Sequence, residues 1–232
     1  MRNKEIPLQA LPDTQNISFA LQDEPFVEIR SYSQGKIQAD MQYYKANRTG
    51  AIAEAYMRKT VADKLLKALT LLPEGYALKI YDAWRPYAVQ KSLYDEYYDT
   101  LKKENPSLDE AQLHERAKTF VSFPDKSKTV SYVHSSGGAI DLTLVDKTGR
   151  ETDMGCGFDD FTPLAATASL EGSLKNQTAK ENRRLLYYAM TAAGFTNYPA
   201  EWWHYDYGDI FWSAATGKPV LYGSVYEKPN LR

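Results

Sequence analysis

The stretch SYVHSSGGAIDLTL, residues 131–144, decides most of what the sequence predicts about the fold. Its second half has the period-two pattern of a β-strand, in which Ile140, Leu142 and Leu144 face one way and Asp141 faces the other. The apolar face can enter a core while Asp141 faces a cleft. Because a charge inside such a run is costly to bury without a partner, we expect a partner for Asp141 nearby.

Histidine can supply that partner through a shared metal ion. The chain has three histidines, of which His134 begins HSSGGAID and His204 closes the tetrapeptide EWWH. Gly137 and Gly138 allow the backbone to bend, so that His134 and Asp141 can point to the same place. Either motif alone is weak, since a loop histidine is usually at the surface. Together, two imidazoles and one carboxylate with an open fourth position form a catalytic zinc set. We therefore predict one Zn²⁺ per chain, held by His134, Asp141 and His204.

Two further residues suit a hydrolytic site. Glu201 lies three residues before His204, and a straight strand would point these side chains apart, so we expect a bend between them. Arg85, in YDAWRPY, stands where a predicted strand meets a helix, and a fixed guanidinium there can stabilise an oxyanion. Each has a plainer interpretation, a partly buried carboxylate for Glu201 and a surface salt bridge for Arg85. His114, in DEAQLHERAK, is expected on a solvated helix face.

Length and composition predict one sizeable domain. The 232 residues are 43% hydrophobic and 25% charged, which is ordinary for a soluble globular protein. A formal charge of −2 gives no reason to expect nucleic acid or an anionic membrane as a partner. Cys156, the one cysteine, excludes an internal disulfide and is expected to be a small buried residue.

The chain carries no signal that fixes its compartment. No apolar run approaches the roughly 18 residues of a membrane span. The N-terminal stretch also lacks the apolar core of a signal peptide. The sequence is therefore compatible with the cytoplasm and, if a signal peptide was removed, with the periplasm, and it defines no oligomeric state.

The order of elements predicts an α+β fold, a single domain with a central antiparallel sheet flanked by helices. Residues 1–25 are predicted to form an extended lead-in and residues 26–232 the domain. Strands are predicted at 76–84 and within the opening stretch, and helices at 52–72, from Pro86 onward, after residue 107, and at about 179–193. Thr178 and Glu181 are expected to form a capping box at the start of the last helix, and Gly194 to end it.

The motifs DAWRP, HSSGGAID and EWWH, in this order, resemble those of the D-alanyl-D-alanine dipeptidases of the VanX type. These are zinc peptidases of the hedgehog/DD-peptidase fold. Further matches are DLTL at 141–144, MGCGFD at 154–159 and NRRLLYYAMTAAGF at 182–195, so the resemblance covers about residues 40–210. It implies zinc at the three predicted ligands, Glu201 as the general base that activates the zinc-bound water, and Arg85 as the residue that stabilises the tetrahedral intermediate.

The resemblance also implies a substrate site. Asp159 falls where the family places a carboxylate for the substrate's ammonium group. The family's serine two residues before the metal histidine is replaced here by Tyr132, with Ser131 one place earlier, so these two are the candidates for contacting the substrate's carboxylate.

The implied reaction is hydrolysis of the dipeptide D-Ala-D-Ala to two D-alanines, a cell-wall activity related to vancomycin resistance. The charged segment 99–128 is a candidate wall against longer peptides. Without such a wall, the site would suit a D,D-carboxypeptidase or an endopeptidase of peptidoglycan stem peptides. A zinc-binding recognition domain without turnover is the third alternative.

Overall fold

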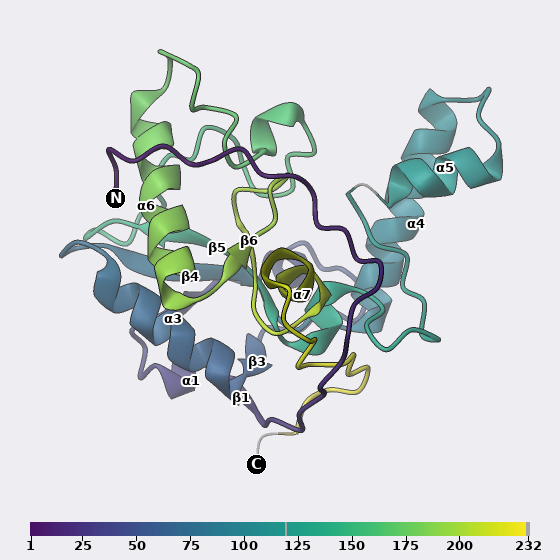
Figure 1. The fold of residues 1–232 in the computed structure, drawn as a ribbon, viewed down its shortest axis with the longest axis horizontal. Coiled ribbons are helices and arrows are strands. Elements are labelled where there is room, and N and C mark those ends of the chain that lie inside the picture. The colour runs from purple at the N-terminus through teal and green to yellow at the C-terminus, as the bar shows by residue number, and fades with distance from the viewer. Residues whose placement is uncertain (119, 231–232) are drawn as a thin grey trace.

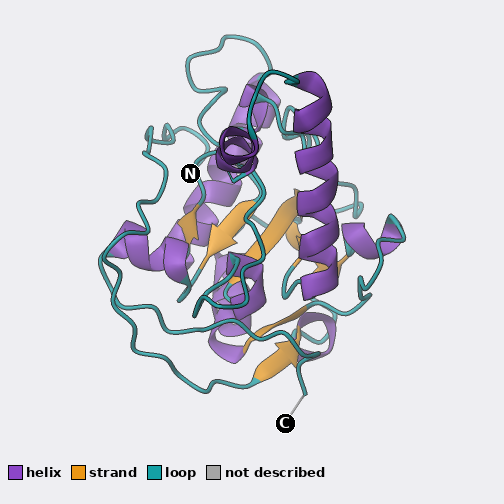
Figure 2. Cartoon of the chain, turned by 90° about the vertical axis from the view of Figure 1, so that its right-hand side faces the viewer, coloured by secondary structure: helices purple, strands orange, loops and turns teal. Residues whose placement is uncertain are grey.

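The computed structural model describes residues 1–118 and 120–230. A five-stranded sheet in the order β2-β4-β5-β7-β6 forms the centre of the molecule (Figure 1). Its strands pair antiparallel except β2, which runs parallel to β4 at one edge. Figure 2 shows these strands in the middle of the molecule with helices around them. The predicted α+β domain with a central antiparallel sheet is confirmed, with one parallel pair added.

The elements have the following bounds. The strands are β1 (Phe26–Glu28), β2 (Gln38–Ala39), β3 (Tyr56–Arg58), β4 (Ala77–Asp82), β5 (Ala139–Val145), β6 (Thr196–Asn197) and β7 (His204–Asp206). The helices are α1 (Ile29–Tyr32), α2 (Gln42–Lys45), α3 (Lys59–Leu71), α4 (Tyr87–Glu104), α5 (Glu110–Ala117), α6 (Gln177–Ala193) and α7 (Ile210–Thr216), with short 3-10 helices at Val133–Ser136 and Pro163–Ala165.

The apolar face of β5 enters the main core as predicted. Ile140, Leu142 and Leu144 are fully buried there, together with Leu65 of α3 and Leu186 of α6. Burying one such side chain contributes about 1.5–3 kcal/mol, so this face fixes which side of the strand points inward. The opposite face of β5 is thereby turned toward the functional site.

The register of three strands lines up polar side chains across the sheet. Asp141 of β5 lies opposite Asp82 of β4 on one side and opposite His204 of β7 on the other. Directly opposite residues in antiparallel strands share a face, with Cβ atoms about 4.5–5.5 Å apart. The sheet therefore brings together residues that are far apart in the sequence.

The helix predicted at 52–72 begins later than expected. Residues Tyr56–Arg58 form β3, which pairs antiparallel with β1, and α3 starts at Lys59. The backbone hydrogen bonds of this pairing override the helical pattern at the start of the segment. The predicted end is confirmed, because α3 stops at Leu71, just before Pro73.

The predicted capping box of α6 is wrong. Asn176 is the N-cap, and its side chain accepts a hydrogen bond from the backbone N–H of Ala179. The helix therefore begins at Gln177, and Thr178 lies inside its first turn. Gly194 does end the helix, with a positive φ of 105° that glycine adopts without a steric penalty.

Helices α4 and α5 project from the sheet as an arm, at the right of Figure 1. They confirm the helices predicted from Pro86 and after residue 107. His114 on α5 is only partly solvated, because its ring packs against Tyr98 at 4.7 Å and against Tyr94 at 6.0 Å between centroids. None of the helices among the described residues combines the length and apolarity of a membrane span.

The N-terminal 25 residues contain no helix and cross the surface of the domain in front of α6 (Figure 1). Ile6 is buried, and the backbone N–H groups of Ala20 and Gln22 donate to the carbonyls of Val220 and Leu221. The N-terminal segment is therefore hydrogen-bonded to a segment near the C-terminus, and it also packs on the domain.

Candidate metal centre and active site

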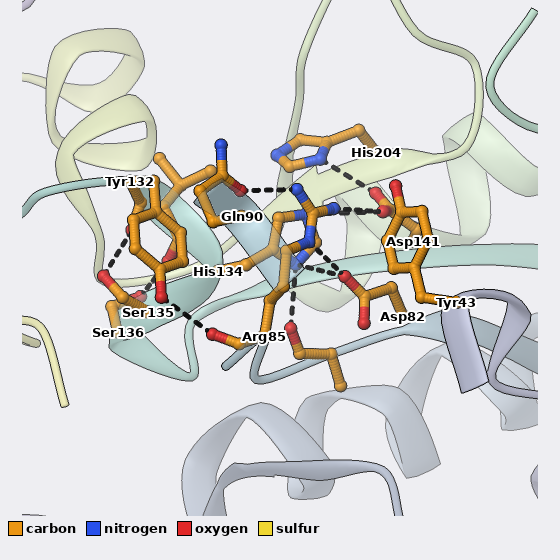
Figure 3. Close-up of polar contacts among 12 residues, drawn as sticks. Tyr43, Asp82, Arg85, Gln90, Tyr132, His134, Ser135, Ser136, Asp141 and His204 are labelled. Carbon is orange, nitrogen blue, oxygen red and sulfur yellow. Dashed lines mark hydrogen bonds and ion pairs between the residues drawn. The ribbon is translucent and has the colours of Figure 1, made fainter. Parts of the chain in front are cut away.

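The three predicted ligands converge in one buried cluster (Figure 3). The short 3-10 helix before β5 carries His134, whose Nδ1 donates to the carbonyl of Ala83 at 2.8 Å and whose Nε2 lies 3.3 Å from Asp141 Oδ2. His204 Nδ1 lies 2.9 Å from Asp141 Oδ1. One ligand atom from each residue lies within 4.8 Å of the others. The bend at Gly137, with φ of 73°, permits this approach.

A second carboxylate orients His204. Asp206, two residues along β7 on the same face, is 1% exposed and lies 2.8 Å from His204 Nε2. This pairing leaves Nδ1 of His204 to face Asp141, and carboxylates that bind the far nitrogen of a metal-ligating histidine commonly have this role. Sequence reasoning missed Asp206, although the H-x-D spacing in a strand is a signal for it.

The electrostatics of the cluster favour a cation. Burial alone would raise the pKa of Asp141, but the neighbouring imidazoles hold it well below its usual range. Burial alone would lower the pKa of His204, yet Asp206 and Asp141 raise it well above its usual value. Two nitrogen donors and one carboxylate are a donor set that fits Zn²⁺.

Arg85 is buried beside the cluster, which excludes the interpretation that it forms only a salt bridge at the surface. Its Nε donates to Asp82 Oδ2 at 2.7 Å, its Nη1 to Gln90 Oε1 at 2.7 Å and its Nη2 to Asp141 Oδ2 at 3.4 Å (Figure 3). The ring of Tyr43 lies 4.9 Å from the guanidinium carbon. Asp82 was missed from the sequence, although a charge at the end of an apolar strand signals it.

Glu201 lies on the expected bend before β7. Its backbone N–H donates to Tyr198 O, and the N–H of His204 donates back to Glu201 O at 3.4 Å. Glu201 Oε2 lies 3.8 Å from His204 Nδ1. Burial raises the pKa of Glu201 to about 8, although His204 opposes the shift. A carboxylate with a raised pKa beside a metal-ligand set is suited to exchange protons near neutral pH.

Asp159 faces the same cavity from the segment between β5 and α6. Its Oδ2 accepts a hydrogen bond from the hydroxyl of Tyr43 at 3.0 Å. Burial raises the pKa of Asp159 to about 7, and Arg85 opposes the shift. The carboxylate thus sits in a place where a neighbouring cation would stabilise its charged form. Tyr43 was not identified from the sequence.

A cavity of about 360 Å³ joins these groups. Gln90, Leu93 and Tyr97 of α4 form one wall, and the segment 99–128 adds Phe120 and Val121. The predicted wall segment therefore does line the cavity.

The two residues at the position of the family's serine differ in placement. Tyr132 lines the cavity, but its hydroxyl donates to the backbone carbonyl of Arg85 at 2.9 Å. Ser131 is not among the described residues that line the cavity, and its backbone N–H donates to Ser224 Oγ. Cys156 is half-buried rather than buried, and its Sγ accepts a hydrogen bond from Arg183.

A buried cluster of two histidines and one aspartate that could hold a metal ion, with a carboxylate of raised pKa and a fixed guanidinium beside it, is the arrangement of a metal-dependent hydrolase. The comparisons with known proteins agree with this class. The profile of the D-Ala-D-Ala dipeptidase family matches residues 34–216. The chain belongs to this family, and the resemblance seen in its motifs is confirmed.

Several D-alanyl-D-alanine dipeptidases are similar to the chain. The protein of Synechocystis is 26% identical over 84% of this chain and 79% of its own length. That of Escherichia coli is 31% identical over 66% of this chain and 67% of its own. That of Enterococcus faecium is 34% identical over 62% of this chain and 69% of its own.

Proposed function

We propose that this protein hydrolyses the free dipeptide D-Ala-D-Ala to two D-alanines with one zinc ion held by His134, Asp141 and His204. The observation that carries the proposal is one cavity that contains this ligand set together with Glu201, Arg85 and Asp159. The names of the relatives support the substrate.

A bound zinc ion would polarise the peptide carbonyl and acidify the attacking water. The proton transfers fall to Glu201, which would accept a proton from that water and return it to the leaving amine. Its raised pKa suits both steps, because the carboxylate can bind and release a proton near neutral pH. Asp206 would hold the imidazole of His204 in one orientation throughout.

Arg85 would stabilise the negative charge that develops on the carbonyl oxygen. Asp82 and Gln90 hold its guanidinium from two sides, so little reorganisation is needed when the charge appears. Removing one such donor typically lowers the rate by about 100- to 1,000-fold.

Asp159 would bind the ammonium group of the substrate. The carboxylate is half-buried and accepts a hydrogen bond from the neutral hydroxyl of Tyr43, so the ammonium group of an incoming substrate would further stabilise its charged form. A site that requires a free amine selects a dipeptide over a longer peptide, whose corresponding nitrogen is an uncharged amide. Tyr132 remains the candidate from the cavity wall for the other end of the substrate.

The test is the release of D-alanine from D-Ala-D-Ala and from a pentapeptide that ends in D-Ala-D-Ala, each with zinc-loaded protein. We expect turnover of the dipeptide and little turnover of the pentapeptide. Preference for the pentapeptide would instead identify a carboxypeptidase, and turnover of neither with zinc bound would identify a recognition domain.

A further inference from the structure

Arg183, on α6, is a buried cation that the catalytic site described above does not use. It is 1% exposed, and each of its three side-chain nitrogens donates into the segment 154–169 that links β5 to α6. The acceptors are Met154 O (2.6 Å), Ala166 O (2.8 Å), Ser169 Oγ (3.0 Å), Leu164 O (3.0 Å) and Cys156 Sγ (3.4 Å). One side chain therefore joins both ends of this segment.

Hydrogen bonds, and not an ion pair, satisfy the buried guanidinium of Arg183. Among the described residues, the hydrogen-bond acceptors of its guanidinium are carbonyls, a hydroxyl and a thiol, none of them a carboxylate, and burial lowers its pKa. Burying a cation without a counter-ion is unfavourable unless hydrogen bonds satisfy it. An apolar side chain would fill the same space without that penalty. What an apolar side chain cannot provide is five fixed contacts to a segment without regular strands or long helices.

The middle of the segment carries the proposed ammonium site. Between the contacts at Cys156 and Leu164 lie Phe158, Asp159 and Phe161, of which the last two line the cavity. Asp159 has a φ of 57°, in the left-handed region that residues other than glycine rarely adopt. Such a conformation persists only where the surroundings impose it.

The far end of the segment supports the bend that carries Glu201. The carbonyl of Ala165 accepts from the N–H of Trp202 at 3.0 Å, and Thr167 Oγ1 donates to Glu201 O at 3.2 Å. The same segment thus holds the backbone on both sides of the cavity, at Asp159 and at Glu201.

We propose that Arg183 is a positioning residue that fixes the distance between the ammonium-binding carboxylate and the proton-transferring carboxylate. This inference rests on the proposed function of Asp159 and Glu201. The guanidinium touches neither residue. It acts by holding the one segment that places both.

The test compares Arg183→Lys and Arg183→Met with a matched variant at the next position. Lysine keeps the charge but cannot make the forked contacts, and methionine keeps the volume alone. Arg184→Met is the control, because Arg184 pairs with Glu171 and binds the N-terminal segment but makes none of the five contacts of Arg183. The readout is the ratio of kcat/KM for D-Ala-D-Ala to that for N-acetyl-D-Ala-D-Ala, measured at equal zinc content.

We expect both Arg183 variants to raise KM for the free dipeptide and to narrow this ratio by on the order of tenfold, since small misplacements of a binding group are sufficient for such losses. Arg183→Lys should narrow the ratio of kcat/KM values less than Arg183→Met does. Arg184→Met should lower stability and leave the ratio within twofold of wild type. A merely structural role would reduce activity on both substrates together and leave the ratio unchanged.

The inference is overturned if folded, zinc-loaded Arg183 variants keep the wild-type ratio while Asp159→Asn changes it. If the Arg183 variants do not fold, Cys156→Ala and Ser169→Ala, which each remove one acceptor, must narrow the ratio, and an unchanged ratio in both also overturns it. If wild type shows no preference for the free dipeptide, the proposed function fails and this inference fails with it.

Discussion

At the scale of single residues, Asp141 connects the parts of the site, since its carboxylate contacts His134, His204 and Arg85. The sequence predicted these four because each is a chemically conspicuous type in an unusual setting. It did not predict Asp82 or the other supporting residues, because their importance comes from the register between strands. Local signals exist at Asp82 and Asp206, but they do not show which side chains these residues contact, because that depends on the pairing of distant segments.

Asp159→Asn tests the ammonium site at this scale. The amide keeps the shape of the carboxylate but removes its charge. We therefore expect kcat/KM for D-Ala-D-Ala to fall and kcat/KM for N-acetyl-D-Ala-D-Ala to change little. The acetylated substrate has no ammonium group for Asp159 to bind, so it lacks this interaction in wild type as well as in the variant. Steady-state kinetics on both substrates measure this. Equal kcat/KM for the two substrates in wild type would contradict the dipeptidase proposal and favour a carboxypeptidase.

At the scale of elements, β5 was predictable because its alternating pattern agrees with its place in the sheet. The start of α3 and the cap of α6 were not, and for different reasons. Pairing with β1 converts residues 56–58 into a strand, which only tertiary contacts can specify. At α6, two residues of capping type, Asn176 and Thr178, lie close together, and the sequence pattern favoured the one that completes a T-x-x-E box.

Asn176→Ala and Thr178→Ala distinguish the two caps. Alanine at 176 removes the hydrogen bond to Ala179 and must adopt a φ of 54°, so unfolding free energy should fall by about 2 kcal/mol. Alanine at the exposed position 178 should change it by less than about 0.5 kcal/mol. Urea denaturation of the zinc-loaded variants gives both values. If Thr178→Ala lowered the unfolding free energy more than Asn176→Ala does, Thr178 and not Asn176 would be the residue that caps the helix.

At the scale of the whole molecule, the metal centre joins segments from distant parts of the chain. The proposed ligands come from the 3-10 helix before β5, from β5 itself and from β7, so a metal ion that binds all three binds only the folded state. The family and the α+β class were predictable from spaced motifs. The arm of α4 and α5, and the path of residues 1–25 across the surface, depend on packing that the motifs do not describe.

Metal removal should therefore lower the melting temperature. A ligand that binds only the native state at 100 times its Kd contributes about 2.7 kcal/mol, which corresponds to roughly 5–10 °C for a chain of this size. Thermal unfolding with zinc and with a chelator measures the difference. His134→Ala should bind less zinc and lose the chelator effect. Unchanged zinc content in this variant, or equal melting temperatures for wild type in both conditions, would contradict the proposed ligands.

The most direct test of the hydrolytic centre is to measure zinc content and D-Ala-D-Ala hydrolysis together in wild type and in Glu201→Ala. Glu201 is not one of the three ligands, so the variant should keep one zinc per chain. It should lose at least about 100-fold in kcat, because proton transfer by a positioned side chain contributes at least that much. A variant that keeps its zinc and more than about a tenth of the wild-type rate would show that Glu201 is not the base.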